Sequence, residues 1–242
     1  MRRLALRAQS GGLVICHDSV TCTGRVAIVT GGSRGVGREV VRKLASRDYA
    51  LVVGYIRNQA AAESAVEEVL AADGTALAVR ADVADELDVE RLFAETACSF
   101  GGVDVVVHTA SRVVSGPAAD CDLEGFDAVQ RTNVRGTFVV NRQAARELRA
   151  GGAIVNVSGV AAGAPGLAVP TDAASAASRG AVEAMTRVLA GQLRGRDVTV
   201  NAVAPGLAGH DVAAAVARVV ALLVGGDGHA LNGQVIRIDR WI

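Results

Sequence analysis

Seven short apolar runs, none with the polar–apolar alternation of a half-exposed strand, are spaced along this 242-residue chain and separated by helical patterns. The predicted strands are residues 26–30, 50–55, 75–80, 103–108, 153–158, 198–203 and 234–238. Strands that are apolar on both faces and separated by helices form a parallel sheet covered on both sides. We therefore expect an α/β fold of the Rossmann type: doubly wound, with a seven-stranded, mostly parallel sheet and helices on both faces.

The segments between these runs carry apolar residues at helical spacing. Helices are predicted over residues 36–46, 60–73, 85–100, 123–149, 175–193 and 212–224, and Gly74 is the expected stop of the second one. No Pro- or Ser-rich linker interrupts the series, so residues 23–242 are expected to form a single domain. Residues 1–22 fit no element: a disordered extension, an extra strand and an artefact of the choice of start site all stay open.

Composition excludes several classes of protein. Half of the residues are hydrophobic and 21% are charged, which excludes intrinsic disorder. The 25 basic and 25 acidic residues balance, so nucleic acid is not an expected partner. No apolar run is long enough for a membrane helix or a signal-peptide core, and a cytoplasmic protein is expected. The four cysteines have neither CxxC nor metal-ligand spacing, so reduced structural thiols and no metal site are expected.

The first predicted strand runs into the sequence TGGSRGVG at residues 30–37 and then into a helix. Glycines at such a junction let the backbone turn tightly and approach a pyrophosphate, whose charge is stabilised by the free N–H groups of the helix. In this position between the first strand and the first helix, the pattern indicates a dinucleotide site. The expected binding residues are Gly31, Ser33, Arg34, Gly35, Val36 and Gly37.

The end of the second predicted strand indicates which dinucleotide is bound. An NAD site usually has a carboxylate there for the ribose 2′-hydroxyl. Here Tyr55 takes that position, Arg57 and Asn58 follow, and no carboxylate comes before Glu63. Arg34 and Arg57 can pair with a 2′-phosphate instead, although Arg57 can also be a solvated loop charge. NADP(H) is therefore favoured over NAD(H).

With these motifs in this order, residues 24–239 resemble the short-chain dehydrogenase/reductase family, close to its 3-oxoacyl-carrier-protein reductase-like members. The glycine turn matches the family's TGxxxGxG motif, and VNAVAPG at 200–206 and NGQVIRID at 232–239 continue the register. The resemblance implies further cofactor contacts from Asp82, Val83, Thr109, Ala110, Ser111, Pro205 and Gly206. It also places Asn133 on the family's helix asparagine, and His108 where the family usually has an asparagine.

The catalytic positions implied by the resemblance do not match the family. There a serine holds the substrate carbonyl, a tyrosine relays a proton, and a lysine four residues later lowers the tyrosine pKa and binds the nicotinamide ribose. In this sequence the aligned residues are Gly159, Ser175 and Arg179, with Ser158 one place before the serine position. No tyrosine or lysine occurs anywhere after residue 55, so realignment cannot supply the missing YxxxK motif.

The loss concerns proton delivery, which is worth about 10²–10⁴ in rate for such a reaction. Ser175 is too weak an acid and too short to copy a phenol, and Arg179 does not readily release a proton, although it can still bind ribose hydroxyls. Asn133 alone remains of the four family residues, and it can equally be a buried group that fixes local backbone or water. His210 stands where a threonine usually holds the nicotinamide amide, and the substrate-covering segment is reduced to residues 206–211.

Three hypotheses follow. The preferred one is a family member that binds the dinucleotide but has lost the usual chemistry and acts as a non-catalytic or regulatory partner. The second is an enzyme repurposed for a cyclisation, elimination or isomerisation, with His210 and Asp172 as acid–base groups. The third is a weakly active NADP(H)-dependent oxidoreductase that works from Asn133, Ser158 and bound water. The predicted helices at 123–149 and 175–193 resemble those of four-helix interfaces in the family, so a homodimer or tetramer, or a hetero-oligomer with an active paralogue, is expected.

Overall fold

The computed structural model describes residues 24–114, 117–158, 173–206 and 212–238. Within these ranges, seven strands form one sheet in the order β3-β2-β1-β4-β5-β6-β7. They are β1 (Val26–Thr30), β2 (Ala50–Tyr55), β3 (Thr75–Arg80), β4 (Val103–His108), β5 (Leu148–Val157), β6 (Thr199–Pro205) and β7 (Val235–Ile238). The predicted doubly wound sheet is confirmed, and every pairing between neighbouring strands is parallel.

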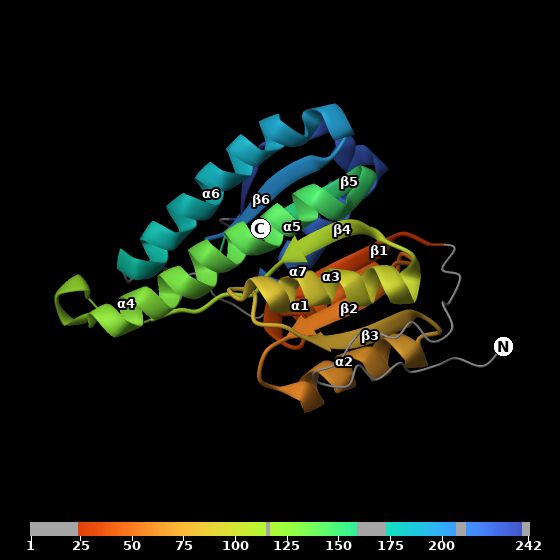
Figure 1. Ribbon diagram of the computed structural model, residues 1–242, viewed down its shortest axis with the longest axis horizontal. Helices are drawn as coiled ribbons and strands as arrows, with labels where there is room; N and C mark the ends of the chain where they lie inside the picture. Colours follow the sequence, from red (N-terminus) through yellow and green to blue (C-terminus); the bar gives the residue numbers. More distant parts are fainter. Residues whose placement is uncertain (1–23, 115–116, 159–172, 207–211, 239–242) are drawn as a thin grey trace.

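The helices cover both faces of the sheet (Figure 1). They are α1 (Gly35–Ala45), α2 (Gln59–Ala71), α3 (Glu86–Phe100), α4 (Leu123–Gln130), α5 (Gly136–Glu147), α6 (Ala173–Leu193) and α7 (Val212–Leu223), with short turns η1 (Ala118–Asp120), η2 (Arg131–Arg135), η3 (Arg194–Arg196) and η4 (Gly226–Ala230). Helices α1, α2 and α7 pack on one face, and α3, α5 and α6 on the other. The strand order reverses between β1 and β4, which leaves a crevice at their carboxyl ends, where such sheets bind ligands.

Both faces of the central strands are buried, because their side chains alternate between two apolar cores. In β1, Ala27 and Val29 belong to the core beneath α1, α2 and α7, whereas Val26 and Ile28 belong to the core beneath α3, α5 and α6. None of these four side chains is exposed to solvent. Burial on both faces explains why the strand sequences are continuous apolar runs.

The helix predicted over 123–149 is wrong in two respects. Residues Arg131–Arg135 form a π-helical turn, η2, which separates α4 from α5. The last predicted residues belong instead to β5, whose first residue Leu148 pairs with Val103 of β4. A π turn adds a residue to one turn of helix without changing the apolar pattern much, so helical spacing does not predict it.

The end of α2 also differs from the prediction. The helix ends at Ala71, and Asp73, rather than Gly74, takes the left-handed conformation, with φ of 65°. Gly74 donates its N–H to the carbonyl oxygen of Val69 at 2.9 Å, and a Cβ at Gly74 would lie only 2.7 Å from the Val69 side chain. Glycine is therefore needed here for close packing on the helix, not for a positive φ.

One of the cysteine predictions is wrong. Cys98, on α3, is disulfide-bonded, whereas Cys121, next to η1, is free. Reduced thiols were expected because the four cysteines lack a motif, but cysteine spacing alone does not predict which side chains meet in the folded chain.

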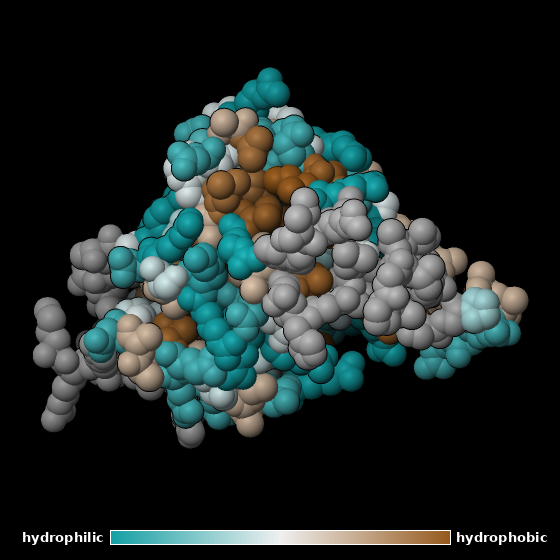
Figure 2. Space-filling view, turned by 180° about the vertical axis from the view of Figure 1, so that it is seen from behind, coloured by the Kyte–Doolittle hydropathy of each residue, from teal (hydrophilic) through white to brown (hydrophobic). Residues whose placement is uncertain are grey.

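The surface seen from behind is mostly hydrophilic, with apolar residues gathered in its upper part (Figure 2). Over the ranges that the structure describes, no helix combines the length and the apolar character needed to cross a membrane. The same ranges contain no group of three or more His, Cys, Asp or Glu side chains that could hold a metal ion.

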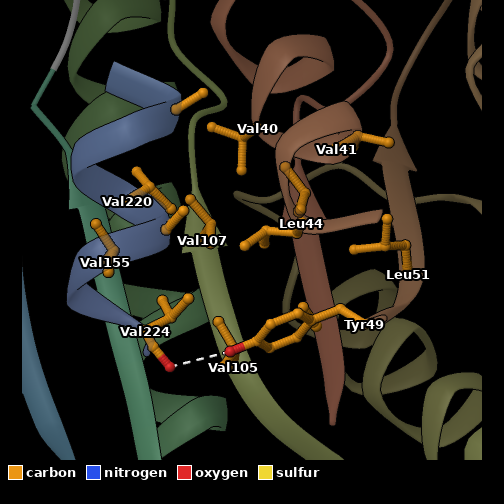
Figure 3. Close-up of a cluster of buried hydrophobic side chains, with 14 of the residues drawn as sticks. Val40, Val41, Leu44, Tyr49, Leu51, Val105, Val107, Val155, Val220 and Val224 are labelled. Atoms are coloured by element: carbon orange, nitrogen blue, oxygen red, sulfur yellow. Dashed lines mark hydrogen bonds between the residues drawn. The ribbon is translucent and has the colours of Figure 1, made fainter. Parts of the chain in front are cut away.

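Backbone carbonyl groups at the carboxyl end of α7 accept hydrogen bonds from side chains that come just before β1 and β2. The hydroxyl of Tyr49 donates to the Val224 carbonyl at 3.0 Å (Figure 3), and Arg25 donates to the same oxygen at 2.7 Å. Arg47 donates to the Ala221 carbonyl at 2.6 Å. The last carbonyls of a helix have no partner within it, so these donors both complete α7 and attach it to the strands beneath.

Replacing Tyr49 with Phe should lower the free energy of unfolding by about 1 kcal/mol, because it removes one hydrogen bond and keeps the buried ring. The loss stays at this level because Arg25 still donates to Val224. Urea denaturation followed by circular dichroism measures the change. Tyr55→Phe is the matched control, since the Tyr55 hydroxyl makes no hydrogen bond within the described ranges. A loss of about 3 kcal/mol or more would contradict this account, because that is the cost of an unpaired buried carbonyl.

Candidate functional site

A cavity of about 740 Å³ lies at the carboxyl ends of β1, β2 and β4. Most of the predicted cofactor residues line it: Gly31, Ser33, Arg34, Gly35, Val36, Gly37, Tyr55, Arg57, Asn58, Asp82, Val83, Thr109, Ala110 and Ser111. They converge because parallel strands end at the same edge of the sheet. Three other predicted cofactor residues, Arg179, Pro205 and Gly206, are not part of its lining.

The glycine turn lets three backbone segments meet at the floor of this cavity. Gly31 has a left-handed φ of 69°, and a Cβ on it would lie 2.9 Å from the Cα of Ala110, in the loop after β4. A Cβ on Gly37 would overlap the carbonyl oxygen of Gly31. Thr109 joins the same loop to β1, since its hydroxyl donates to the Thr30 carbonyl at 2.7 Å. Glycine is therefore required at both positions by close approach of the backbone.

The amino terminus of α1 lines the cavity and has no side-chain cap. Arg34 is the N-cap residue, and its side chain makes no capping hydrogen bond. The first turn of the helix also carries no acidic residue. The first N–H groups of a helix have no partner within it and favour negative charge. This end of α1 is therefore suited to a phosphate group.

Positive charge predominates around the cavity. Four arginines line it, Arg34, Arg57, Arg112 and Arg131, whereas Asp82 is the one acidic residue in the lining. Arg131 pairs with Asp82 at 2.8 Å. Within the described part of the chain, the guanidinium groups of the other three arginines form no ion pair. A cavity with this balance of charge favours a ligand with several negative charges.

The residues after β2 are divided between structure and cavity. Asn58 is the N-cap of α2, and its side-chain oxygen accepts a hydrogen bond from the Ala61 N–H at 3.0 Å. Tyr55 is half-buried, and burial raises the pKa of its hydroxyl. Arg57 is exposed at the rim. Of the three predicted cofactor residues, Asn58 therefore has a structural role as well.

Asn133 has the full set of hydrogen bonds that its side chain can donate. Its Oδ1 accepts from the backbone N–H of Arg112 at 2.8 Å, and its Nδ2 donates to the Arg112 carbonyl at 2.9 Å and to the hydroxyl of Ser178 at 3.0 Å. The residue lies in the π turn η2 and is 8% exposed. Of the two interpretations that the sequence left open, these contacts match the one in which Asn133 fixes local backbone.

Ser158 lies outside the large cavity. It is 4% exposed and lines a small cavity of about 10 Å³, together with Ala110, Asn133, Thr137 and Ser178. Ser175 is 7% exposed in the first turn of α6, and Arg179 is half-buried one turn later. The structure therefore brings Ser158 and Asn133 together in a small cavity that adjoins the large one, since Ala110 and Ser111 line both.

Residues 25–219 match the model of the short chain dehydrogenase family. The chain belongs to this family. It is 39% identical over 201 residues to versicolorin reductase 1 of Aspergillus parasiticus, which covers 83% of this chain and 76% of that protein. It is 33% identical over 257 residues to a probable tetrahydroxynaphthalene reductase of Zymoseptoria tritici, covering 92% and 96%. A solved short chain dehydrogenase of Burkholderia cenocepacia in complex with NADP superimposes with a TM-score of 0.81 at 32% identity, covering 91% and 98%.

The family resemblance predicted from the motifs is thus confirmed. Three residues named for the chemistry, Gly159, Asp172 and His210, lie outside the described residues. The assignments of individual residues to catalysis or to cofactor binding stay predictions.

Several residues of the short chain dehydrogenase cavity were missed from the sequence. They include Ile56, Arg112, Val113, Ala128, Arg131 and Thr132. Two signals were present, because Arg112 directly follows the predicted contacts Thr109–Ser111 and Arg131 lies two residues before Asn133. Motif matching stops at the ends of its motifs, so charged neighbours on the same wall were not assigned.

His108, at the asparagine position of the family, is a buried structural residue. It is 1% exposed on β4, and its Nδ1 lies 2.8 Å from the hydroxyl of Thr30. Burial lowers the pKa of the imidazole to about 4, so the ring is neutral at physiological pH. It does not line the large cavity and is not placed to exchange protons with a ligand there.

The buried imidazole makes stability depend on pH. Below the ordinary histidine pKa of about 6.5 the unfolded chain binds a proton that the folded chain excludes until about pH 4, so the free energy of unfolding falls across this window. His108→Asn removes the titration, and wild type should lose about 3 kcal/mol more than this variant on acidification to about pH 4. Urea denaturation at intervals of pH measures the difference.

The matched control for this prediction is His229→Asn, at an exposed histidine of η4, which should follow the wild-type profile. A gap between wild type and His108→Asn that stays constant with pH would show that the buried ring is not the titrating group.

Proposed function

We propose that this protein binds NADP(H) in the cavity between β1, β2 and β4 and does not reduce carbonyl groups by the usual route of its family. One observation carries the proposal: the glycine turn that approaches a phosphate is intact, while no tyrosine or lysine exists after residue 55 to deliver a proton. The fit of the cavity to a dinucleotide rests on its uncapped helix terminus, its close glycine backbone and its positive charge.

The preference for NADP(H) is supported by the charge at the rim. No carboxylate stands at the end of β2, where it would bind a ribose 2′-hydroxyl. Arg34 and Arg57 line the cavity from either side of that strand end, both exposed and both without an ion pair in the described ranges. Guanidinium groups bind phosphate in pairs of parallel hydrogen bonds, so these two suit a 2′-phosphate.

Bound NADPH supplies a hydride, and reduction of a carbonyl then requires a proton from the protein. Ser175 occupies the position of the proton donor, but an aliphatic hydroxyl is far less acidic than a phenol. Arg179 holds its proton too tightly to transfer it, although it can bind ribose hydroxyls. Asn133 has its amide hydrogens already donated to Arg112 and Ser178. These side chains can therefore hold a cofactor without completing a reduction.

A non-catalytic role in an assembly agrees with the surface of α5 and α6. Phe138 on α5 is 53% exposed and Val188 on α6 is 61% exposed, so both helices present a large apolar side chain to solvent. We propose a homodimer or tetramer through these helices, or a mixed oligomer with an active paralogue in which this subunit regulates. The cytoplasmic location stays a prediction from the sequence.

Calorimetric titration should show NADPH binding with a dissociation constant at least about tenfold lower than that for NADH, since a hydrogen bond to a charged group is worth about 1.5–3 kcal/mol. The same protein should oxidise NADPH no faster than buffer across a broad panel of ketones and quinones.

A variant combining Gly159→Ser, Ser175→Tyr and Arg179→Lys restores the family's proton donor and is the control for the assay. It should gain about 10²-fold or more in turnover. Wild-type turnover at the rate of an active family member would contradict the proposal, and so would failure of the wild type to bind either dinucleotide.

Replacing Arg57 with Ala should weaken NADPH binding about tenfold and leave NADH binding nearly unchanged, because only NADPH carries the 2′-phosphate. Arg34→Ala should behave in the same way but lower NADH affinity slightly as well, since Arg34 also borders the glycine turn. Arg194→Ala, an exposed arginine at the opposite edge of the sheet, is the control. Equal losses for NADPH and NADH in Arg57→Ala would indicate a general charge effect instead of recognition of the 2′-phosphate.

A further inference from the structure

We propose that Arg112 is a phosphate-recognition residue on the β4 side of the cavity and that Asn133 is the residue that positions it. The inference rests on the proposed function, since it concerns the same cavity. It adds a contact that neither the glycine turn nor the arginines near β2 provide. It also assigns a role to Asn133 that does not involve proton transfer.

The first observation is how firmly the backbone of Arg112 is held. Strand β4 ends at His108, and Arg112 lies four residues further along, in a connecting loop. Both the N–H and the carbonyl of Arg112 are nevertheless bonded, at 2.8 and 2.9 Å, to the side chain of Asn133. A third bond, to Ser178 of α6, fixes the orientation of the amide. A loop residue is thus held by two hydrogen bonds, as a residue within a sheet would be.

The second observation is that the side chain of Arg112 is available to a ligand. Arg112 is exposed and lines the large cavity. In the described part of the chain its guanidinium group has no hydrogen-bond or ion-pair partner. Arg131, on the same wall, is already paired with Asp82. Arg112 is therefore the arginine on this wall whose charge is available to a ligand.

The third observation is the position of Arg112 relative to the other cationic residues. In the sheet, β1 lies between β2 and β4. Arg57 follows β2 and Arg112 follows β4, so they stand on opposite sides of the glycine turn that follows β1. Arg57 is placed for a phosphate on one half of a dinucleotide that crosses this edge. Arg112 is placed for a phosphoryl group at the centre of the dinucleotide or beyond it, away from Arg57.

The chemistry of the group defines the ligand. A guanidinium group offers planar, paired donors that match two oxygens of a phosphoryl group, and it stays charged at any physiological pH. The phosphoryl group has two possible sources: the pyrophosphate of the dinucleotide, or a phosphorylated second ligand beside it. The two sources predict different results with truncated probes.

Calorimetry with NADPH and with adenosine 2′,5′-bisphosphate distinguishes them. Adenosine 2′,5′-bisphosphate carries the 2′-phosphate and the adenosine-side phosphate of the pyrophosphate, but it lacks the second phosphate and the nicotinamide half of the molecule. If Arg112 binds the nicotinamide-side phosphate of the pyrophosphate, Arg112→Gln should weaken NADPH about tenfold and leave the bisphosphate within about twofold of wild type. If Arg112 binds the adenosine-side phosphate, both ligands should weaken about tenfold. Arg194→Gln removes the same charge at the opposite edge of the sheet and should change neither.

The second arm uses inorganic phosphate with the NADPH-loaded protein. The phosphoryl group belongs to a second ligand if two results are found together. Arg112→Gln leaves NADPH affinity unchanged, and the NADPH-loaded wild type binds inorganic phosphate whereas the NADPH-loaded variant does not. If Arg112→Gln changes neither titration, or if Arg194→Gln produces an equal loss, the proposal is overturned.

Asn133→Ala tests the positioning role. Because Asn133 acts through Arg112, the loss of phosphate affinity caused by Arg112→Gln should largely disappear when it is measured in the Asn133→Ala background. Additive losses would show that Asn133 has a separate, structural effect, and thermal melting of each variant separates unfolding from loss of binding.

The proposal and the proposed function fail in different ways. If the wild type does not bind NADPH but binds pyrophosphate in a manner that depends on Arg112, the proposed function is wrong and the role of Arg112 stands. If NADPH binds tightly and Arg112→Gln changes neither titration, the proposed function stands and the role of Arg112 is wrong.

Discussion

The candidate site depends on one point where three backbone segments approach closely. There the turn after β1, the start of α1 and the loop after β4 lie so near one another that Gly31 and Gly37 have no space for a Cβ. The hydroxyl of Thr109 closes the junction by donating to Thr30. This contact sets the distance between β1 and β4 at their carboxyl ends and therefore the shape of the cavity that opens above them. A side chain at either glycine would separate α1 from the loop and remove the site.

Binding and chemistry depend on different parts of such a site. The part of the site suited to binding consists of backbone atoms, the amino terminus of α1 and two glycines, all of which the packing of the sheet requires. The chemistry of the family depends on a few side chains, and the sequence comparison predicts Gly159, Ser175 and Arg179 at their positions. Ser175 and Arg179 belong to neither apolar core, so substitutions at these two positions leave the packing on both faces of the sheet unchanged. A chain of this family can therefore lose its proton donor while it keeps its fold and its cavity.

The sequence predicted the strands closely, because a strand buried on both faces must be apolar at every position, and β1 to β4 have the predicted bounds. It missed the π turn η2, which depends on one extra residue in a helix and leaves apolar spacing intact. The residues of the glycine turn were predicted since their chemistry is tied to a local pattern. Arg112 and Arg131 were not, because they reach the cavity through the topology of β4 and α4 and belong to no motif, although both lie close in sequence to predicted residues.

Asn133 shows why a residue retained from a catalytic set does not by itself indicate catalysis. The sequence predicts that it is the one catalytic position of the family that this chain keeps, and the sequence alone left its role open. Its amide makes three hydrogen bonds, to both backbone groups of Arg112 and to Ser178. Replacing it would leave the backbone of the loop after β4 without its partners beside a helix, which costs stability whether or not a reaction occurs. The architecture of the cavity wall is therefore sufficient to explain this asparagine without a catalytic role.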